Sequence, residues 1–175
     1  MEMTQEPQWL TAEEQQTWLE LTAMLSWLPD ALDAQLQRDA GLSHFEYQVM
    51  AMLSMSPQRT RRMKEVAALA NGSLTRLSRT VDRLEARGWV TRRPDPEDGR
   101  STLAVLTDAG WDKVVATAPD HVAEVRRLVF DPLTRSQVGQ LHEIASRVRR
   151  VVHPDGFLPS LPASETPDPQ RPARG

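Results

Sequence analysis

The sequence contains no cysteine among its 175 residues. Disulfide bonds, thiolate metal sites and thiol-based redox sensing are therefore excluded, and nothing indicates an oxidising compartment. Aromatic residues are scarce, at 5%, and no segment has the long apolar run of a membrane-spanning helix. The polar, acidic N-terminus also lacks the basic and apolar regions of a signal peptide. We therefore expect a soluble, cytoplasmic protein without a membrane partner.

Motifs typical of enzymes are also missing. The sequence has no glycine-rich phosphate-binding loop, no nucleophile elbow and no pair of carboxylates in the context of a pocket. The histidines are scattered and show no metal-ligand spacing; they are His44, His121, His142 and His153. We predict a protein that is not an enzyme and has no catalytic residues, no cofactor and no metal site.

The charge of the chain is unevenly distributed. The net charge of −3 by itself argues against a nucleic-acid partner. Residues 59–103, however, contain eleven Lys or Arg and six Asp or Glu, a net charge of +5, and the remainder carries −8. A basic centre within an acidic chain is typical of a local polyanion-binding surface. A solvated charged face is the alternative that charge alone leaves open.

Apolar residues three and four positions apart predict a long first helix over residues 11–40. Thr11 and Glu14 form a capping box at its start, and Gly41 ends it. Pro29 is expected to kink or interrupt this helix, because proline removes a backbone donor and its ring collides with the preceding turn.

Three shorter helices are expected next. Ser43 and Glu46 repeat the capping pattern for a helix that ends near residue 55, and Thr60 is expected to cap a helix over residues 60–70. The Asn-Gly-Ser sequence at 71–73 predicts a tight turn before a helix over residues 74–87. Two short helices joined by a turn that contains glycine are typical of a helix-turn-helix motif.

A β-hairpin is predicted directly after this motif. Strand-like segments at residues 89–93 and 102–107 flank Asp98-Gly99, where Gly99 is expected to take the positive φ of a tight turn. Arg100 lies at the tip, and we expect Asp98 to accept a hydrogen bond from its guanidinium and hold it outward. The predicted fold class is mainly α with a small β-wing: a winged helix-turn-helix plus a helical region.

The C-terminal part predicts two more helices, the first interrupted near Pro119 and the second beginning near Thr134. The expected domains follow from these elements. They are a disordered N-terminus (1–8), a helical dimerisation region (9–40 and 108–152), a winged helix-turn-helix DNA-binding domain (41–107) and a disordered proline-rich tail (153–175).

The helix over residues 74–87 is amphipathic. Its apolar face, expected to be buried, consists of Leu74, Leu77, Val81 and Leu84, and the opposite side carries Arg76, Arg79 and Arg83. The second helix of a helix-turn-helix enters the DNA major groove, where arginine can donate two hydrogen bonds to guanine. A solvent-exposed helix with arginines on its outer face is the alternative.

Other charged residues of this helix are expected to act locally. Because carboxylates are repelled by phosphates, Asp82 and Glu85 are expected to pair with neighbouring cations. Arg83 and Arg87, near the helix end, are expected to contact the DNA backbone or neighbouring acids rather than bases.

Residues 65–110 resemble the multiple antibiotic resistance regulator (MarR) family of bacterial transcription factors. The wing signature is Asp98-Gly99-Arg100, followed by Leu106, Thr107 and Gly110 and preceded by Asp82-Arg83-Leu84-Glu85 and Gly88. The resemblance implies a homodimer in which the first helix and the last two helices interlock. Each subunit then places its winged helix on a palindromic double-stranded DNA site.

The resemblance also implies the site residues. Base recognition maps onto Ser73, Thr75, Arg76 and Arg79, the minor-groove arginine is Arg100, and Thr60 or Arg62 contacts phosphates. Arg92 and Asp98 complete the candidate DNA-binding set.

Members of the family commonly repress genes and release DNA when a small aromatic or phenolic anion binds between the dimer and DNA-binding regions. Candidate ligand-binding residues are Trp18, Trp27, His44, Tyr47 and Arg62. Aromatic residues at helical spacing more often belong to a core than to a ligand site. A second hypothesis for the whole protein is a winged-helix protein-interaction adaptor without specific DNA binding.

Overall fold

The computed structural model describes residues 7–154, and most of the two segments expected to be disordered lies outside this range. The elements are α1 (Ala12–Ala40), α2 (His44–Ser54), a 3-10 turn η1 (Pro57–Arg59), β1 (Thr60–Arg62), α3 (Met63–Leu69), α4 (Leu74–Ala86), β2 (Val90–Pro94), β3 (Thr102–Leu106), α5 (Asp108–Val125), a π-helical turn η2 (Arg126–Phe130) and α6 (Arg135–Val152). The predicted fold class, mainly α with a small β-wing, is confirmed.

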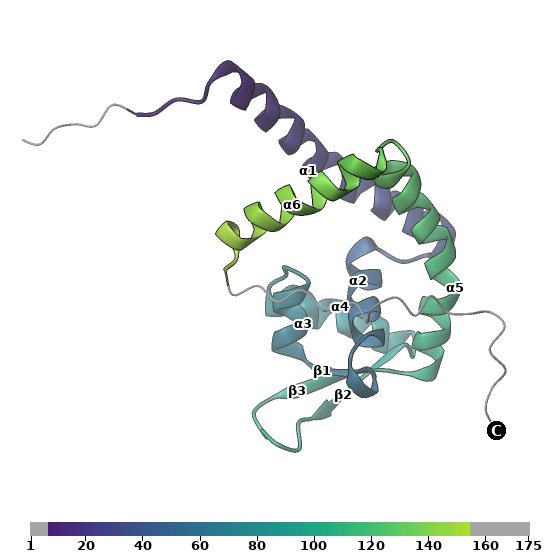
Figure 1. Ribbon diagram of the computed structural model, residues 1–175. Coiled ribbons are helices and arrows are strands. Elements are labelled where there is room, and N and C mark those ends of the chain that lie inside the picture. The colour runs from purple at the N-terminus through teal and green to yellow at the C-terminus, as the bar shows by residue number, and fades with distance from the viewer. Residues whose placement is uncertain (1–6, 155–175) are drawn as a thin grey trace, which may run out of the picture.

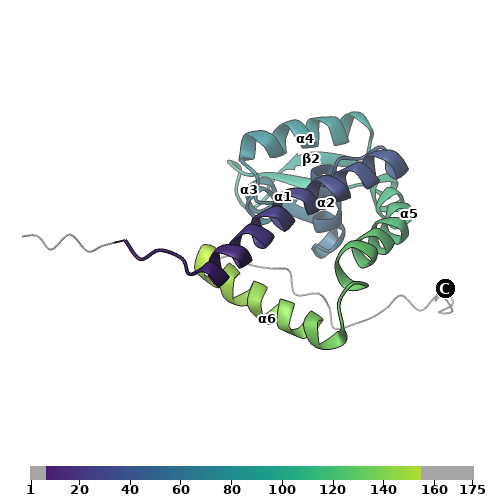
Figure 2. The ribbon, with the colours of Figure 1, turned by 90° about the horizontal axis from the view of Figure 1, so that it is seen from above.

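The elements form a compact lobe with long helices above and beside it. Helices α2, α3 and α4 and the sheet make up the lobe, α1 crosses above it and α5 runs along its side (Figure 1). Helix α6 stands away from the lobe, as the view from above shows (Figure 2). Between residues 7 and 154 no helix is both long and apolar enough to cross a membrane.

Local capping signals begin the helices as predicted. Thr11 and Ser43 form capping boxes with Glu14 and Glu46, and Gly41 ends α1 in the left-handed conformation at φ 64°. Helices α1 and α5 continue through Pro29 and Pro119, so the interruption expected near Pro119 and the one considered beside a kink at Pro29 were wrong. A proline removes only one backbone donor, and helical turns on both sides maintain each helix.

The helix start expected at Thr60 was also wrong. Thr60–Arg62 form β1, which pairs antiparallel with β3 so that Thr60 lies opposite Val105 and Arg62 opposite Leu103. Strand β2 pairs with the other edge of β3, in the order β1-β3-β2. Pairing with a strand 45 residues away along the chain overrides a local capping pattern, and α3 begins only at Met63.

The core joins the lobe to the C-terminal half of α1. Its fully buried apolar side chains come from α1, α2, α3, α4 and β2 and from the α1–α2 turn; they include Leu36, Leu42, Val49, Leu53, Val66, Leu77, Val81, Leu84 and Val90. Of the apolar face predicted for α4, only Leu74 is wrong, since it is 54% exposed. Burying the other three fixes the rotation of α4 and turns its opposite side to solvent.

Candidate nucleic-acid interface

The N-terminal half of α4 presents hydroxyl and guanidinium groups to solvent. Ser73 caps the helix, with its Oγ accepting from the Arg76 backbone N–H at 3.1 Å. Ser73, Thr75 and Arg79 are exposed. The guanidinium of Arg79 makes no hydrogen bond or ion pair with any residue between 7 and 154. This side of α4 therefore offers donors that the subunit itself does not use.

Two arginines beside this surface are held by α2. The Arg76 guanidinium carbon lies 4.0 Å from the centre of the Phe45 ring, a cation–π contact. Arg83 donates from Nε to Glu46 Oε1 at 2.8 Å. Burial acts to raise the pKa of Glu46, but hydrogen bonds from Ser43 and Arg83 outweigh it and lower the pKa below its usual value. Helix α2 thus fixes the inner edge of the surface.

The remaining charges around α4 pair locally. Arg92 Nη1 lies 2.7 Å from both Asp82 Oδ1 and Glu85 Oε2, and Nη2 donates to the Ser78 carbonyl at 2.7 Å. Arg87 donates to the Gly41 carbonyl at 2.9 Å. The local pairing predicted for Asp82 and Glu85 is confirmed. Arg92 fastens β2 to α4, so its guanidinium is occupied within the subunit.

The tip of the wing contains the predicted turn, in which the Ser101 backbone N–H donates to the Asp98 carbonyl at 2.8 Å, but its geometry differs from the prediction. Residues 95–101 form a longer loop, and Gly99 does not take a positive φ. Asp98 Oδ1 accepts from the Arg100 backbone N–H at 3.1 Å, and Oδ2 accepts from Ser101 Oγ at 2.7 Å. The expected bond from Asp98 to the Arg100 guanidinium was therefore wrong. Asp98 shapes the loop, and the loop presents Arg100.

A second carboxylate anchors this loop to the lobe. Asp95 is 5% exposed, and its Oδ2 accepts from Arg62 Nε at 2.6 Å. The pKa of Asp95 is lowered by the backbone N–H of Glu97 and by the Arg62 guanidinium. Arg62 thus joins the start of α3 to the wing. Thr60 lies in β1, where its Oγ1 donates to the Gln58 carbonyl at 2.9 Å.

A depression of about 500 Å³ separates α4 from the wing. Lys64 and Arg100 line it from two sides, with Leu74, Ser78 and Thr102 among the other lining residues. Lys64 was not among the predicted candidate residues. Its place in the basic segment was visible, but its position opposite Arg100 depends on β1 and β3 pairing.

The five candidate ligand-binding residues do not share one depression. His44 lines a hollow of about 860 Å³ between α1, α2 and α4, together with Arg76, Arg79 and Arg83. Trp27 lines an apolar hollow between α1, η2 and α6. Trp18 is 54% exposed on α1, Tyr47 is buried in α2, and Arg62 lies at the wing.

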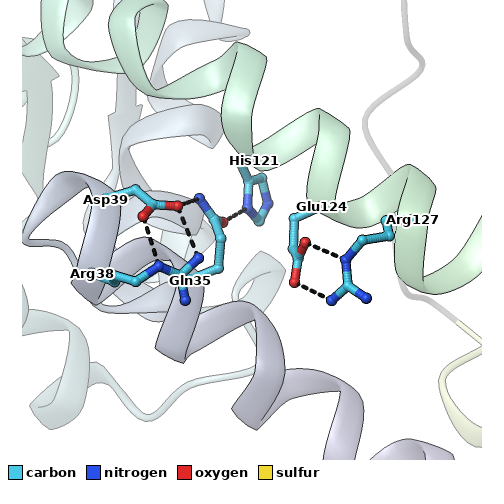
Figure 3. Close-up of polar contacts among 6 residues, drawn as sticks. All are labelled: Gln35, Arg38, Asp39, His121, Glu124 and Arg127. Atoms are coloured by element: carbon cyan, nitrogen blue, oxygen red, sulfur yellow. Dashed lines mark hydrogen bonds and ion pairs between the residues drawn. The ribbon is translucent and has the colours of Figure 1, made fainter.

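A polar cluster connects α1 with α5 (Figure 3). His121 Nδ1 lies 3.1 Å from Gln35 Oε1, and Gln35 Nε2 donates to Asp39 at 3.0 Å. The His121 ring meets Tyr47 edge-on at 4.6 Å and lies 6.1 Å from the His44 ring. Tyr47 and His44 were both predicted candidates, whereas His121 was not, because it comes from a helix more than 70 residues later in the chain.

Comparisons with known proteins give a consistent result. Residues 40–101 match the model of the MarR family. The transcriptional regulators MhqR and YkoM of Bacillus subtilis are each 30% identical over 109 and 105 residues. These matches cover 62% and 59% of this chain, and 72% of MhqR and 66% of YkoM.

A solved structure of Sco3205, a MarR family transcriptional regulator from Streptomyces coelicolor in complex with DNA, is 45% identical. It superposes with a TM-score of 0.82 over 87% of this chain and 95% of that chain. The arrangement of α4 and the wing, together with these similarities, establishes that the chain belongs to the MarR family of winged helix-turn-helix transcription factors.

Proposed function

We propose that this protein is a sequence-specific DNA-binding regulator that acts as a homodimer on a palindromic operator, represses transcription there and is released by a small aromatic anion. One observation carries the proposal. The guanidinium groups of Arg79 on α4 and Arg100 on the wing both face solvent, and neither bonds within residues 7–154. Unused cations at two projecting elements suit two grooves of a duplex.

Each element has a groove that suits it. The N-terminal half of α4 enters the major groove, where Ser73, Thr75, Arg76 and Arg79 contact base edges. The wing places Arg100 in the adjacent minor groove, whose negative potential is strongest over A·T pairs. Phosphates between the grooves attract Lys64. Thr60 is close enough to the wing to contribute, whereas Arg62 and Arg92 are left out because carboxylates of the subunit occupy their guanidinium groups.

A dimer accounts for the apolar surface that one subunit leaves exposed. Large exposed apolar residues on α1 and α6 include Trp18, Leu25, Trp27, Ile144, Val148 and Val151. Surfaces of this kind mark protein interfaces when they are contiguous. Helix α6 stands apart from the lobe (Figure 2), so a second copy packed against α1 and α6 would bury these side chains.

The hollow beside His44 is the proposed effector site. Its volume of about 860 Å³ suits a small molecule, and three arginines line it. Arg76 and Arg79 also belong to the DNA-facing side of α4. A carboxylate or phenolate bound there competes with DNA for the same guanidinium groups, which gives a physical route to release.

The first test is DNA binding. The full chain is titrated against its own upstream intergenic duplex and a scrambled duplex of equal length, over a salt series. We expect nanomolar affinity for the first, roughly a thousandfold preference over the second, and a steep loss of affinity with salt. Weak and equal binding to both duplexes, repeated across genomic fragments, contradicts the proposal and favours the protein-interaction adaptor.

The effector is tested by competition on the operator complex. Salicylate and benzoate are titrated into the complex while fluorescence anisotropy follows the duplex. We expect release by at least one of them, with benzyl alcohol inactive because it carries no charge. Equal effects of the neutral and anionic compounds would contradict a site built from arginines.

A further inference from the structure

Leu74 is an apolar side chain that the fold leaves in an unusual place. It is the first residue of α4 and is 54% exposed, while the other three residues of the predicted apolar face, Leu77, Val81 and Leu84, are fully buried. Its chain neighbours Ser73 and Thr75 are exposed and polar. Leu74 is therefore an exposed apolar side chain within the polar, solvent-facing start of α4, where a contact from outside the subunit can reach it.

The surroundings of Leu74 show which kind of contact this is. Leu74 lines the depression between α4 and the wing, and Lys64 and Arg100 line the same depression. Cations from α3 and from the wing would attract a phosphate backbone, and this suits a duplex that crosses the depression from the major groove at α4 to the minor groove at the wing. Leu74 then faces the last major-groove base pairs before the wing.

We propose that Leu74 recognises the C5-methyl group of a thymine at the wing-side edge of each half-site. In the major groove thymine is the base that presents a methyl group, and a branched aliphatic side chain complements it. The neighbouring guanidinium and hydroxyl groups are suited to guanine and adenine edges. Leu74 therefore adds recognition of a thymine that these polar groups do not supply. This inference rests on the proposed DNA-binding function.

Arg100 and Leu74 then act on adjoining parts of one sequence. The wing arginine favours a narrow A·T minor groove, and Leu74 favours thymine in the major groove immediately before it. The operator is therefore expected to have a thymine at the inner boundary of the A·T-rich flank. The methyl group of this thymine faces α4.

The test replaces the thymines of the operator by deoxyuridine, one symmetric pair at a time. Deoxyuridine keeps every hydrogen-bonding group and lacks only the methyl. We expect one position at which deoxyuridine weakens binding of the natural chain about fourfold per half-site, the effect of losing one methyl-sized apolar contact. With the Leu74→Ala variant, the same replacement should have no effect.

Thr75→Ser is the matched control, because it removes the one other methyl group at the start of α4 and keeps the hydroxyl. The deoxyuridine effect should persist in Thr75→Ser. Its loss in Thr75→Ser rather than in Leu74→Ala, or an equal effect in both variants and the natural chain, overturns the proposal. So does an operator in which no thymine is sensitive.

Failure of the proposed function has a different signature. Absence of any preference for operator over scrambled duplex contradicts DNA recognition itself, before deoxyuridine is introduced. Circular dichroism checks that Leu74→Ala is folded, which is expected because the residue is exposed and alanine favours helix. Leu74→Met, which keeps an apolar chain of similar reach, should retain the deoxyuridine effect.

Discussion

Arginine side chains in the lobe divide into those that hold the structure and those that remain available. Arg62, Arg83 and Arg92 each bond to at least one carboxylate inside the subunit. Arg79 and Arg100 have no such partner between residues 7 and 154. Because all of these residues are the same type, only the positions of neighbouring carboxylates distinguish an arginine that is bound within the subunit from one that is available for the proposed DNA contact.

Arg79→Ala is expected to cost about 1–3 kcal/mol of binding free energy on the operator and to relax base preference at one position per half-site. The reason is the loss of a bidentate contact to a base edge. Electrophoretic shifts with a set of single-base operator variants measure both effects. Arg135→Ala, an exposed arginine at the start of α6, is the control. Equal losses on operator and scrambled DNA would instead identify Arg79 as a backbone contact.

Arg100→Ala should weaken binding several-fold on operators with A·T-rich flanks and much less on operators with G·C-rich flanks. A narrow A·T minor groove concentrates negative potential, and the variant loses the cation that exploits it. Anisotropy titrations with two duplexes that differ only in their flanks make the comparison. A loss that does not depend on the flanks means that Arg100 is outside the minor groove.

At the scale of elements, α1, α2 and α5 meet where His121 contacts Gln35 and Tyr47. Figure 3 shows the contact between His121 and Gln35. This junction joins the lobe to the helices proposed for dimerisation. Its histidines are partly shielded, so burial lowers the pKa of His121 and of His44, the latter against the opposing charge of Asp33. The folded state therefore favours neutral imidazoles at this junction.

Stability is expected to decrease as the pH falls below about 6.5. There the unfolded chain protonates these histidines while the folded chain keeps them neutral, so the unfolded state binds more protons and the free energy of unfolding decreases. Above this range both states are neutral and the contribution vanishes. Urea unfolding between pH 7.5 and 5.0 measures the slope.

Two histidine variants distinguish the contribution of this junction to the pH dependence of stability from the contributions of other titratable groups. His121→Gln should flatten the pH dependence, whereas His142→Gln, at an exposed position on α6, should leave it unchanged. An unchanged slope in His121→Gln would assign the effect elsewhere. The acidic groups with lowered pKa, such as Asp95 and Asp98, lose their stabilising contribution only at lower pH.

At the scale of the whole molecule, the acidic chain has its net positive charge in the winged helix, and many of its exposed large apolar side chains are on α1 and α6. These surfaces lie on different elements, so one can face DNA while the other faces a second copy. The separation supports the proposed dimer, because covering α1 and α6 leaves α4 and the wing accessible (Figure 1).

Replacing Ile144 and Val148 together by Asp is expected to yield monomers of about 19.7 kDa. Both residues are exposed on α6, and carboxylates within an apolar interface would remain unpaired. Operator affinity should decrease strongly, since one half-site then binds alone. Analytical ultracentrifugation gives the mass. His142→Asp on the same helix is the control, and a natural chain that is itself monomeric would contradict the dimer.

The sequence by itself determined the features that depend on neighbours along the chain. Capping boxes at Thr11 and Ser43 and the left-handed Gly41 are local chemistry, and they predicted the helix boundaries. The order of helices followed by a hairpin predicted the winged helix. The basic residues of 59–103 predicted a polyanionic partner, because the charge of a segment follows from its composition alone.

Only the tertiary structure decided which residues meet. Strand β1 replaced a predicted helix start because its hydrogen bonds come from β3. The exposure of Leu74 was not predicted. Helical periodicity indicates which residues share a face, but it does not indicate how far the neighbouring element that covers this face extends. Arg92 met Asp82 and Glu85, and His121 met Gln35, through packing between separate elements. Such contacts depend on the relative positions of elements, which sequence periodicity does not contain.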